Sequence, residues 1–155
     1  MRAPRTLGDD EYRALASFRT ELRRFLAFSE QAARAAGLTP QQHQMLLAVR
    51  GHPGPGPASV SDVAEALLLK RHSVTELVSR AAEAGLVERT ADADDARRTL
   101  VVLTPAGEEV LAVLSDLHRR ELHRLRAVVA GLDTLDDPTG PDPVSDLDQG
   151  DADLG

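Results

Sequence analysis

The sequence predicts a mainly α-helical protein that carries one small β-hairpin. Apolar residues recur at helical spacing through most of residues 9–131, which indicates several amphipathic helices. Two short runs, 86–90 and 98–103, favour strands and enclose a polar stretch, which is the pattern of a hairpin. A length of 155 residues suits one domain with a modest core.

The composition excludes several kinds of chemistry. The chain has no cysteine, which rules out disulfides, thiolate zinc sites and cysteine-based redox sensing. No secretory segment or apolar run of membrane-spanning length is present, so we expect a cytoplasmic protein without a membrane partner. There is no nucleophile elbow, Walker loop, HExxH motif or glycine-rich nucleotide turn, so we expect neither an enzyme nor a cofactor.

The net charge of −7 is concentrated at the C-terminal end. Residues 132–155 hold eight of the 25 acidic residues and no Lys or Arg, so residues 1–131 carry 18 basic against 17 acidic side chains. The body of the chain is therefore almost neutral, and any affinity for DNA must come from locally placed arginines. The Asp-, Pro- and Gly-rich residues 132–155 are expected to form a disordered tail.

A long first helix is expected over residues 9–36, started by Asp9 and Asp10 and ended by Gly37. Its apolar positions follow the 3-4-3 spacing of a heptad, which suits packing against another long helix: Leu15, Phe18, Leu22 and Phe25.

A second helix is expected to begin at Thr39, where threonine caps, Pro40 takes the first helical position and Gln42 completes a capping box. It should end near Gly51. Residues 52–58, HPGPGPA, are expected to be an irregular connection.

The next two helices are expected to form a pair joined by a tight turn. Ser61 should cap the first of them, residues 68–71 should form the turn, and residues 72–84 should form the second helix. Gly85 is expected to end that helix in a left-handed conformation.

A hairpin and a final helix should complete the fold. Residues 91–97 form the polar tip between strands 86–90 and 98–103, and Thr104-Pro105 starts a helix that runs to about Gly131. This order of elements predicts a winged helix-turn-helix flanked by long N- and C-terminal helices. The expected divisions are an N-terminal dimerisation helix (1–38), a DNA-binding domain (39–104), a C-terminal dimerisation helix (105–131) and an acidic tail (132–155).

Polar side chains on the helix pair and the wing are the candidate DNA contacts. Such donors and acceptors read base edges and phosphates, and an arginine on a hairpin can enter the minor groove when an aspartate two residues earlier aims it. A solvated helix face or an ordinary surface ion pair would use the same residue types. The turn before the second helix and the hairpin after it favour DNA binding, through Ser61, Lys70, Arg71, His72, Ser73, Thr75, Glu76, Ser79, Arg80, Asp95, Arg97 and Arg98.

Residues 39–107 resemble the multiple antibiotic resistance regulator (MarR) family, and the resemblance extends over roughly the first 130 residues. The matching stretches are LTPQQHQMLLAV, VSDVAEALLLKRHSVTELVSRAAEAGLVER and DADDARRTLVVLTPAGEEVL, which includes the D-x-R of Asp95 and Arg97. The resemblance implies an obligate homodimer, joined by its first and last helices, on a pseudo-palindromic operator in double-stranded DNA. It also implies a repressor that a small ligand, commonly an aromatic anion, releases. Many relatives have arginine at Glu76 and aspartate at Ser79, so their operators do not carry over.

An effector site is expected beside the first helix. Arg19 and Arg23 lie at i, i+4 next to Phe25, and His43 begins the helix expected to pack nearby. An aromatic carboxylate would suit such a site, with its ring on Phe25 and its anion on Arg23 or His43. Solvated arginines beside simple core phenylalanines are the alternative.

Two other functions compete with a ligand-released repressor. One is a winged-helix module that binds another protein and not DNA, which the neutral body and Glu76 allow. The other is a metal-responsive regulator, since His43, His118, Glu121 and His123 could supply ligands. The i to i+5 spacing puts His118 and His123 on different faces of a helix, so no metal site is expected.

Overall fold

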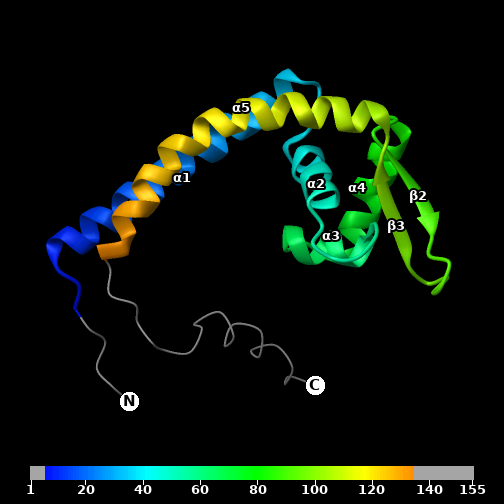
Figure 1. Cartoon of the computed structure of the whole chain (residues 1–155), viewed down its shortest axis with the longest axis horizontal. Coiled ribbons are helices and arrows are strands. Elements are labelled where there is room, and N and C mark those ends of the chain that lie inside the picture. The colour runs from blue at the N-terminus through cyan, green and yellow to red at the C-terminus, as the bar shows by residue number, and fades with distance from the viewer. Residues whose placement is uncertain (1–5, 135–155) are drawn as a thin grey trace, which may run out of the picture.

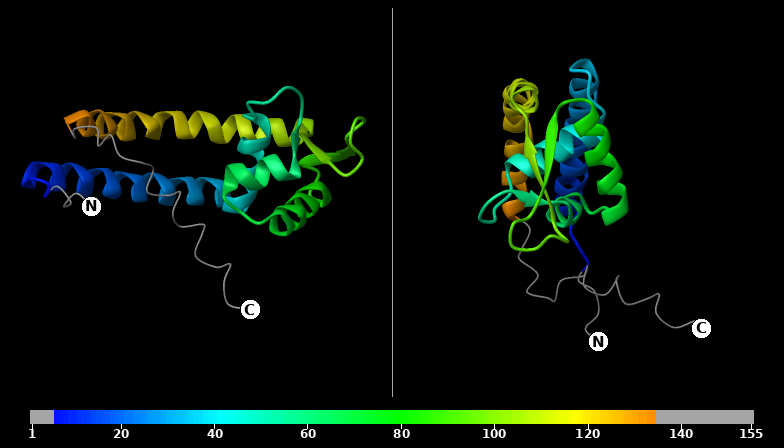
Figure 2. Two further views of the ribbon diagram at one scale, coloured as in Figure 1. Left: turned by 90° about the horizontal axis from the view of Figure 1, so that it is seen from below. Right: turned by 90° about the vertical axis from the view of Figure 1, so that its right-hand side faces the viewer.

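The computed structural model describes residues 6–134. Two long helices, α1 (Asp9–Ala35) and α5 (Pro105–Ala130), run side by side and form an arch that we call the stalk (Figure 1 and Figure 2). The remaining helices and a small sheet form a head at one end of the stalk (Figure 1). The expected mainly helical class with a small sheet is confirmed.

The head begins with α2 (Pro40–Arg50), α3 (Val60–Leu67) and α4 (Arg71–Glu83). Thr39 caps α2 as predicted: its hydroxyl accepts from the Gln42 backbone N–H at 3.1 Å, and the Gln42 side chain accepts from the Thr39 N–H at 2.9 Å. Thr104 caps α5 in the same way, accepting from the Gly107 N–H at 3.1 Å. These two caps thus fix where the head begins after α1 and where α5 begins after the head.

The expectation that Ser61 caps α3 was wrong. Ser59 is the cap, because its hydroxyl accepts from the Asp62 N–H at 3.2 Å while the Asp62 carboxylate accepts from the Ser59 N–H at 2.7 Å. Ser61 lies one residue inside the helix and is exposed. Arg71, expected in the turn, is instead the first residue of α4.

The sheet has three antiparallel strands where a two-stranded hairpin was expected. The strands β1 (Ala58–Ser59), β2 (Val87–Ala91) and β3 (Thr99–Leu103) lie in the order β1-β3-β2. β1 pairs Ala58 with Val101, so the expected irregular connection ends in a strand. Two residues are too few to show alternation in a sequence, and only the pairing with β3 makes them a strand.

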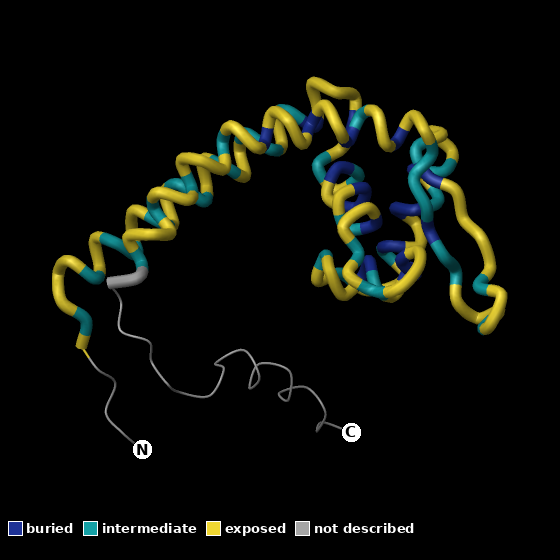
Figure 3. Tube along the Cα trace, in the orientation of Figure 1, coloured by how far each residue is buried: buried dark blue, intermediate teal, exposed yellow. Residues whose placement is uncertain are grey.

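The buried core lies in the head and where the head meets the stalk, as the dark segments of Figure 3 show. α4 buries the four positions predicted from its periodicity, Val74, Leu77, Val78 and Ala81. In the stalk, the heptad positions of α1 are only half-buried against α5, and Ala33 is the one fully buried residue of α1. The apolar residues that the stalk leaves exposed include Tyr12, Leu26, Val113, Leu117, Leu122 and Val129.

The end of the described chain is a short 3-10 turn, Gly131–Thr134. The first residues of the expected acidic tail therefore continue the stalk, and its remainder lies outside the described residues. Among residues 6–134, no helix combines the length and the apolar character needed to cross a bilayer.

Candidate nucleic-acid interface

The candidate residues of α4 form a surface on the head beside the wing. Val74, Leu77 and Val78 face the core, which turns the opposite side of the helix to solvent. Ser73 and Ser79 are half-buried and the others are exposed: Lys70, Arg71, His72, Thr75, Glu76 and Arg80. The structure therefore places these polar groups within reach of an external partner.

Arg97 projects from the wing between β2 and β3, and its side chain is 92% exposed. Asp95 holds the base of that side chain, because its carboxylate accepts from the Arg97 backbone N–H at 3.0 Å and from Nε at 3.2 Å. Both contacts are made by the backbone N–H and Nε, and neither involves a terminal guanidinium nitrogen. The predicted aspartate–arginine pair is present in this geometry.

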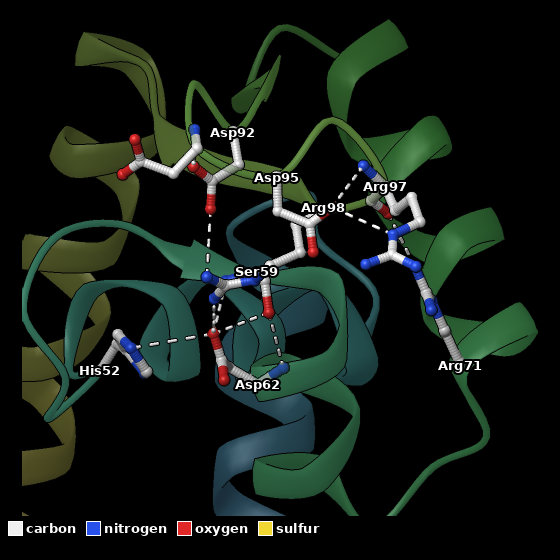
Figure 4. A network of polar contacts seen from close by, with 9 residues as sticks. His52, Ser59, Asp62, Arg71, Asp92, Asp95, Arg97 and Arg98 are labelled. Atoms are coloured by element: carbon white, nitrogen blue, oxygen red, sulfur yellow. Dashed lines mark hydrogen bonds and ion pairs between the residues drawn. The ribbon is translucent and has the colours of Figure 1, made fainter.

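Arg71 links the start of α4 to the wing. Its Nη2 donates to the backbone carbonyl of Arg97 at 3.3 Å (Figure 4). The same helical turn is held by the Thr75 hydroxyl, which donates to the Arg71 carbonyl at 3.0 Å. The first turn of α4 and the tip of the wing are therefore in direct contact.

Asp62 ties α3 to the base of the wing. Its carboxylate accepts from the Ser59 hydroxyl at 2.7 Å, lies 3.6 Å from Nη2 of Arg98 and lies 3.8 Å from Nε2 of His52 (Figure 4). Arg98 also reaches Asp92 at 3.1 Å, so its guanidinium bridges two carboxylates. The hydrogen bonds from the Ser59 hydroxyl and N–H hold the pKa of Asp62 below its ordinary value, with smaller contributions from His52 and Arg98.

Several candidate contacts have partners within the head. Arg80 lies 3.6 Å from Glu76 one turn earlier on α4. The Ser79 hydroxyl accepts from Nη1 of Arg89 on β2 at 2.9 Å. To bind DNA, these side chains would first have to release their partners within the protein, and the same holds for Arg98.

Sequence reasoning missed four residues that shape this surface: Ser59, Asp62, Asp92 and Arg89. The S-x-x-D spacing of Ser59 and Asp62 is a readable capping signal. The contacts of Asp92 with Arg98 and of Arg89 with Ser79 depend on the pairing of β2 with β3 and on α4 packing beside β2, and sequence spacing carries no signal for them.

A cleft of about 550 Å³ lies between α1 and α5, away from this surface. Phe25 lines it as expected, together with Glu21, Arg24, Glu121, Arg124, Leu125 and Ala127. The arginine that α1 contributes to the lining is Arg24, while the expected Arg19 and Arg23 are exposed on α1 and are not in the lining. Arg24 pairs with Glu21, and Arg124 lies 3.6 Å from Glu121.

His43 is buried where α2 meets the stalk and is not among the residues that line the cleft. Its ring lies 4.7 Å from the ring of His118 on α5, which is also buried. Burial, and secondarily the charge of His118, keeps the pKa of His43 below its ordinary value. Within residues 6–134, no cluster of three or more His, Cys, Asp or Glu side chains is arranged to hold a metal ion.

Comparison with curated proteins finds transcriptional regulators. The chain is 29% identical over 103 residues to a protein of Thauera aromatica described as a putative transcriptional regulatory protein for the hcr operon, covering 66% of this chain and 60% of that protein. It is 35% identical over 85 residues to the transcriptional activatory protein BadR of Rhodopseudomonas palustris, covering 55% and 49%. The chain thus spans about half to three-fifths of these relatives.

Solved structures share the fold. AbsC, a MarR family transcriptional regulator from Streptomyces coelicolor, superposes with a TM-score of 0.64 over 94% of this chain and 91% of its own, at 24% identity. The MepR–DNA complex of S. aureus superposes with a TM-score of 0.61 over 72% and 81%, at 22% identity. A family model described as MarR family matches residues 36–98. Residues 36–98 are thus similar to the MarR family, and the described part of the chain shares the winged-helix fold of solved MarR family regulators.

Proposed function

We propose that this protein is a dimeric transcriptional regulator that binds a pseudo-palindromic DNA site through α4 and the wing. The observation that carries the proposal is the pairing of an exposed polar face on α4 with an exposed arginine on the wing, joined by the Arg71 contact. A helix of this kind suits a major groove, and Arg97 suits the minor groove beside it. The curated relatives are named as transcriptional regulators, and MepR, which shares the fold, has been solved with DNA.

Arg97 provides the test of DNA binding. Arg97→Ala should weaken binding to many duplex sequences and lower the salt slope by about one phosphate contact, because the lost group acts as a charge. Arg13→Ala is the control, since Arg13 is also an exposed arginine but lies near the start of α1 and not on the head. Fluorescence anisotropy across a salt series measures both. Binding by neither wild type nor control would favour a winged helix that binds protein.

We propose that residues in the middle of α4 determine which DNA base sequence the protein prefers. Glu76 can accept from the N4 amino group of cytosine if it leaves Arg80, whereas Arg71 and Lys70 would act mainly on phosphates. Glu76→Gln should therefore change the preferred base at one position in each half-site. Selection from a random duplex pool tests this, and an unchanged selected site would remove Glu76 from base reading.

The stalk is proposed to form the dimer interface. Its exposed apolar side chains, among them Val113 and Leu117, would be covered by a second copy. Val113→Asp should produce monomers at micromolar concentration in sedimentation measurements. Leu47→Asp is the control, because Leu47 is similarly exposed but lies on α2 in the head. A folded wild-type monomer at that concentration would contradict this assignment.

We propose further that the regulator is a repressor released by a small aromatic anion. The α1–α5 cleft offers Phe25 for a ring and Arg24 or Arg124 for a carboxylate. Benzoate should raise the melting temperature and release DNA. Arg24→Ala should remove both responses, and its neighbour Arg23→Ala should keep them. If Arg23→Ala or His43→Ala removes them instead, the effector binds at the position expected from the sequence.

The direction of regulation has a second candidate, because BadR is named as an activatory protein. A reporter gene driven by the selected site separates the two. Repression predicts higher expression when the gene for this protein is deleted, and activation predicts lower expression.

A further inference from the structure

Two histidines that the proposed DNA surface does not use are buried against each other. His43 is 4% exposed and His118 is 9% exposed, and their ring centroids lie 4.7 Å apart. Two phenylalanines of α1 meet His118 edge-on, Phe25 at 5.8 Å and Phe28 at 5.4 Å. Two ionisable rings in such surroundings are unusual, because burial disfavours their charged forms.

The hydrogen bonds of the two rings differ. Nδ1 of His118 lies 2.6 Å from the carbonyl oxygen of Leu114, which can only accept, so Nδ1 carries the proton. Nε2 of the neutral ring then accepts from the Ser29 hydroxyl at 2.8 Å. Nδ1 of His43 is buried without a hydrogen-bond partner in the described part of the chain. A proton placed there would add a buried N–H that has no acceptor.

The pair joins three helices at the point where the head meets the stalk. His43 belongs to α2, which packs on α3, α4 and β3 of the head. His118 belongs to α5 and is bonded to Ser29 of α1. The contact between the rings is therefore part of the joint that sets the head against the stalk.

Most charged groups on α1, α2 and α5, the helices around the pair, are engaged with other partners, and Arg19, Arg23, Glu109 and Arg126 are exposed to solvent. His118 is the ionisable group whose charge, when it is protonated, lowers the pKa of His43. On α1 and α5, acidic side chains pair with nearby arginines: Glu21 with Arg24, Glu30 with Arg34, Asp116 with Arg119 and Arg120, and Glu121 with Arg124. Two pairs join different segments of the chain, Glu108 with Arg50 of α2 and Asp62 with Arg98. Glu76 and Arg80 pair within α4. Because these carboxylates are already paired with arginines, they are not available to stabilise a protonated imidazole of His43 or His118.

We propose that the proton is an effector of this regulator: protonation of the buried His43–His118 pair loosens the joint between α2 and the stalk and weakens DNA binding. The inference rests on the proposed DNA-binding function. Two positive rings at this separation would repel each other, and a charged His43 would be desolvated without a hydrogen bond at Nδ1. Separating the rings relieves both penalties, and that separation moves the head relative to the stalk.

The direction of the effect follows from linkage. A histidine that resists protonation in the folded state binds the proton more strongly when the chain unfolds. Stability is therefore full above the unfolded pKa of 6.5 and falls as the pH drops below it towards the folded value. One such histidine changes the folding constant by at most about tenfold per pH unit. Protonation of the exposed His72 on α4 would have the opposite effect on DNA, because it adds a positive charge near phosphates.

The test measures DNA affinity and melting temperature of the full chain from pH 8 to pH 5.5. A duplex selected from a random pool at pH 8 serves as the probe. The wild type should lose affinity by up to about tenfold per pH unit for each proton taken up. His43→Gln and His118→Gln keep a polar side chain that does not titrate, so each should reduce this loss. His123→Gln is the matched control, an exposed histidine on the same helix, and should keep the wild-type response.

Histidine ring signals in NMR spectra of the wild type provide a measurement that needs no variant. The proposal expects His43 and His118 to titrate together with chemical-shift changes at the α2–α5 contact. It is overturned if both rings stay neutral in the folded protein down to pH 5, or if both glutamine variants lose affinity as steeply as the wild type. Absence of DNA binding at pH 8 would contradict the proposed function instead. In that case the melting temperature would still test the histidine pair. It should depend less on pH in His43→Gln and His118→Gln than in the wild type.

Discussion

Replacement of Gly107 by alanine should be among the most damaging single-methyl additions in this chain. Gly107 lies in the first turn of α5, where an added Cβ would sit 2.1 Å from the carbonyl oxygen of Leu86 and 3.1 Å from its carbonyl carbon. Relief of that overlap requires a movement of almost 1 Å between backbone segments, since neither neighbour is the end of a flexible side chain.

The movement would also strain bonds that fix α5 to the end of α4. The Leu86 carbonyl accepts from the Thr104 N–H at 3.0 Å, and the Thr104 hydroxyl donates to the Gly85 carbonyl at 2.6 Å. Overpacking costs about 1–3 kcal/mol and a weakened hydrogen bond about 1 kcal/mol more. Gly107→Ala should therefore lower the free energy of unfolding by about 2–4 kcal/mol and the melting temperature by roughly 5–15 °C.

Urea unfolding followed by circular dichroism measures this change, at one protein concentration so that association does not differ between samples. Gly131→Ala is the control, because Gly131 has an ordinary helical conformation and nothing lies within 4 Å of its added Cβ. It should change stability by less than about 1 kcal/mol. If Gly107→Ala is as stable as Gly131→Ala, the close approach of α5 to Leu86 is not as described.

Three further changes test other parts of the fold by the same unfolding measurement. Ser59→Ala should cost about 1 kcal/mol through loss of the α3 cap, whereas Ser61→Ala should cost less than about 0.5 kcal/mol; equal losses would contradict the capping assignment. Gly85→Ala should cost about 1–2 kcal/mol although nothing crowds its Cβ, because φ is +74° there; a neutral result would mean that the turn can adopt another conformation. In acid, Asp62 should give up its stabilising contribution as the pH falls below 3.8 towards its lower folded pKa, so the stability of Asp62→Asn should depend less on pH in that range. Parallel curves for wild type and Asp62→Asn would show that Asp62 protonates alike in the folded and unfolded states.

Local signals predicted most of the fold, and contacts distant in the sequence decided the rest. Thr39 and Thr104 were recognisable as caps because the residues they bond lie three positions later. The sequence predicted Ser61 as the cap of α3, but Ser59 is the cap, because the Asp62 side chain accepts from the Ser59 N–H while the Asp62 N–H donates to the Ser59 hydroxyl. His43 and His118 are 75 positions apart, so their contact depends on how α2 settles against the stalk, which no periodicity encodes. For the same reason the sequence suggested Arg23 for a cleft that Arg24 lines.

The distribution of buried residues along the stalk gives its two ends different resistance to local opening. In α1 the only buried residue is Ala33, and in α5 the last is His118, so residues 9–32 and 119–130 contain none. Backbone amides in those segments of an isolated chain should exchange with solvent much faster than those of α4, since few buried contacts oppose fraying there. Association through the stalk would slow that exchange, and protection of these amides should therefore rise with protein concentration. Folding of the distal stalk and assembly would then be one coupled event, with the head already formed before the two copies meet.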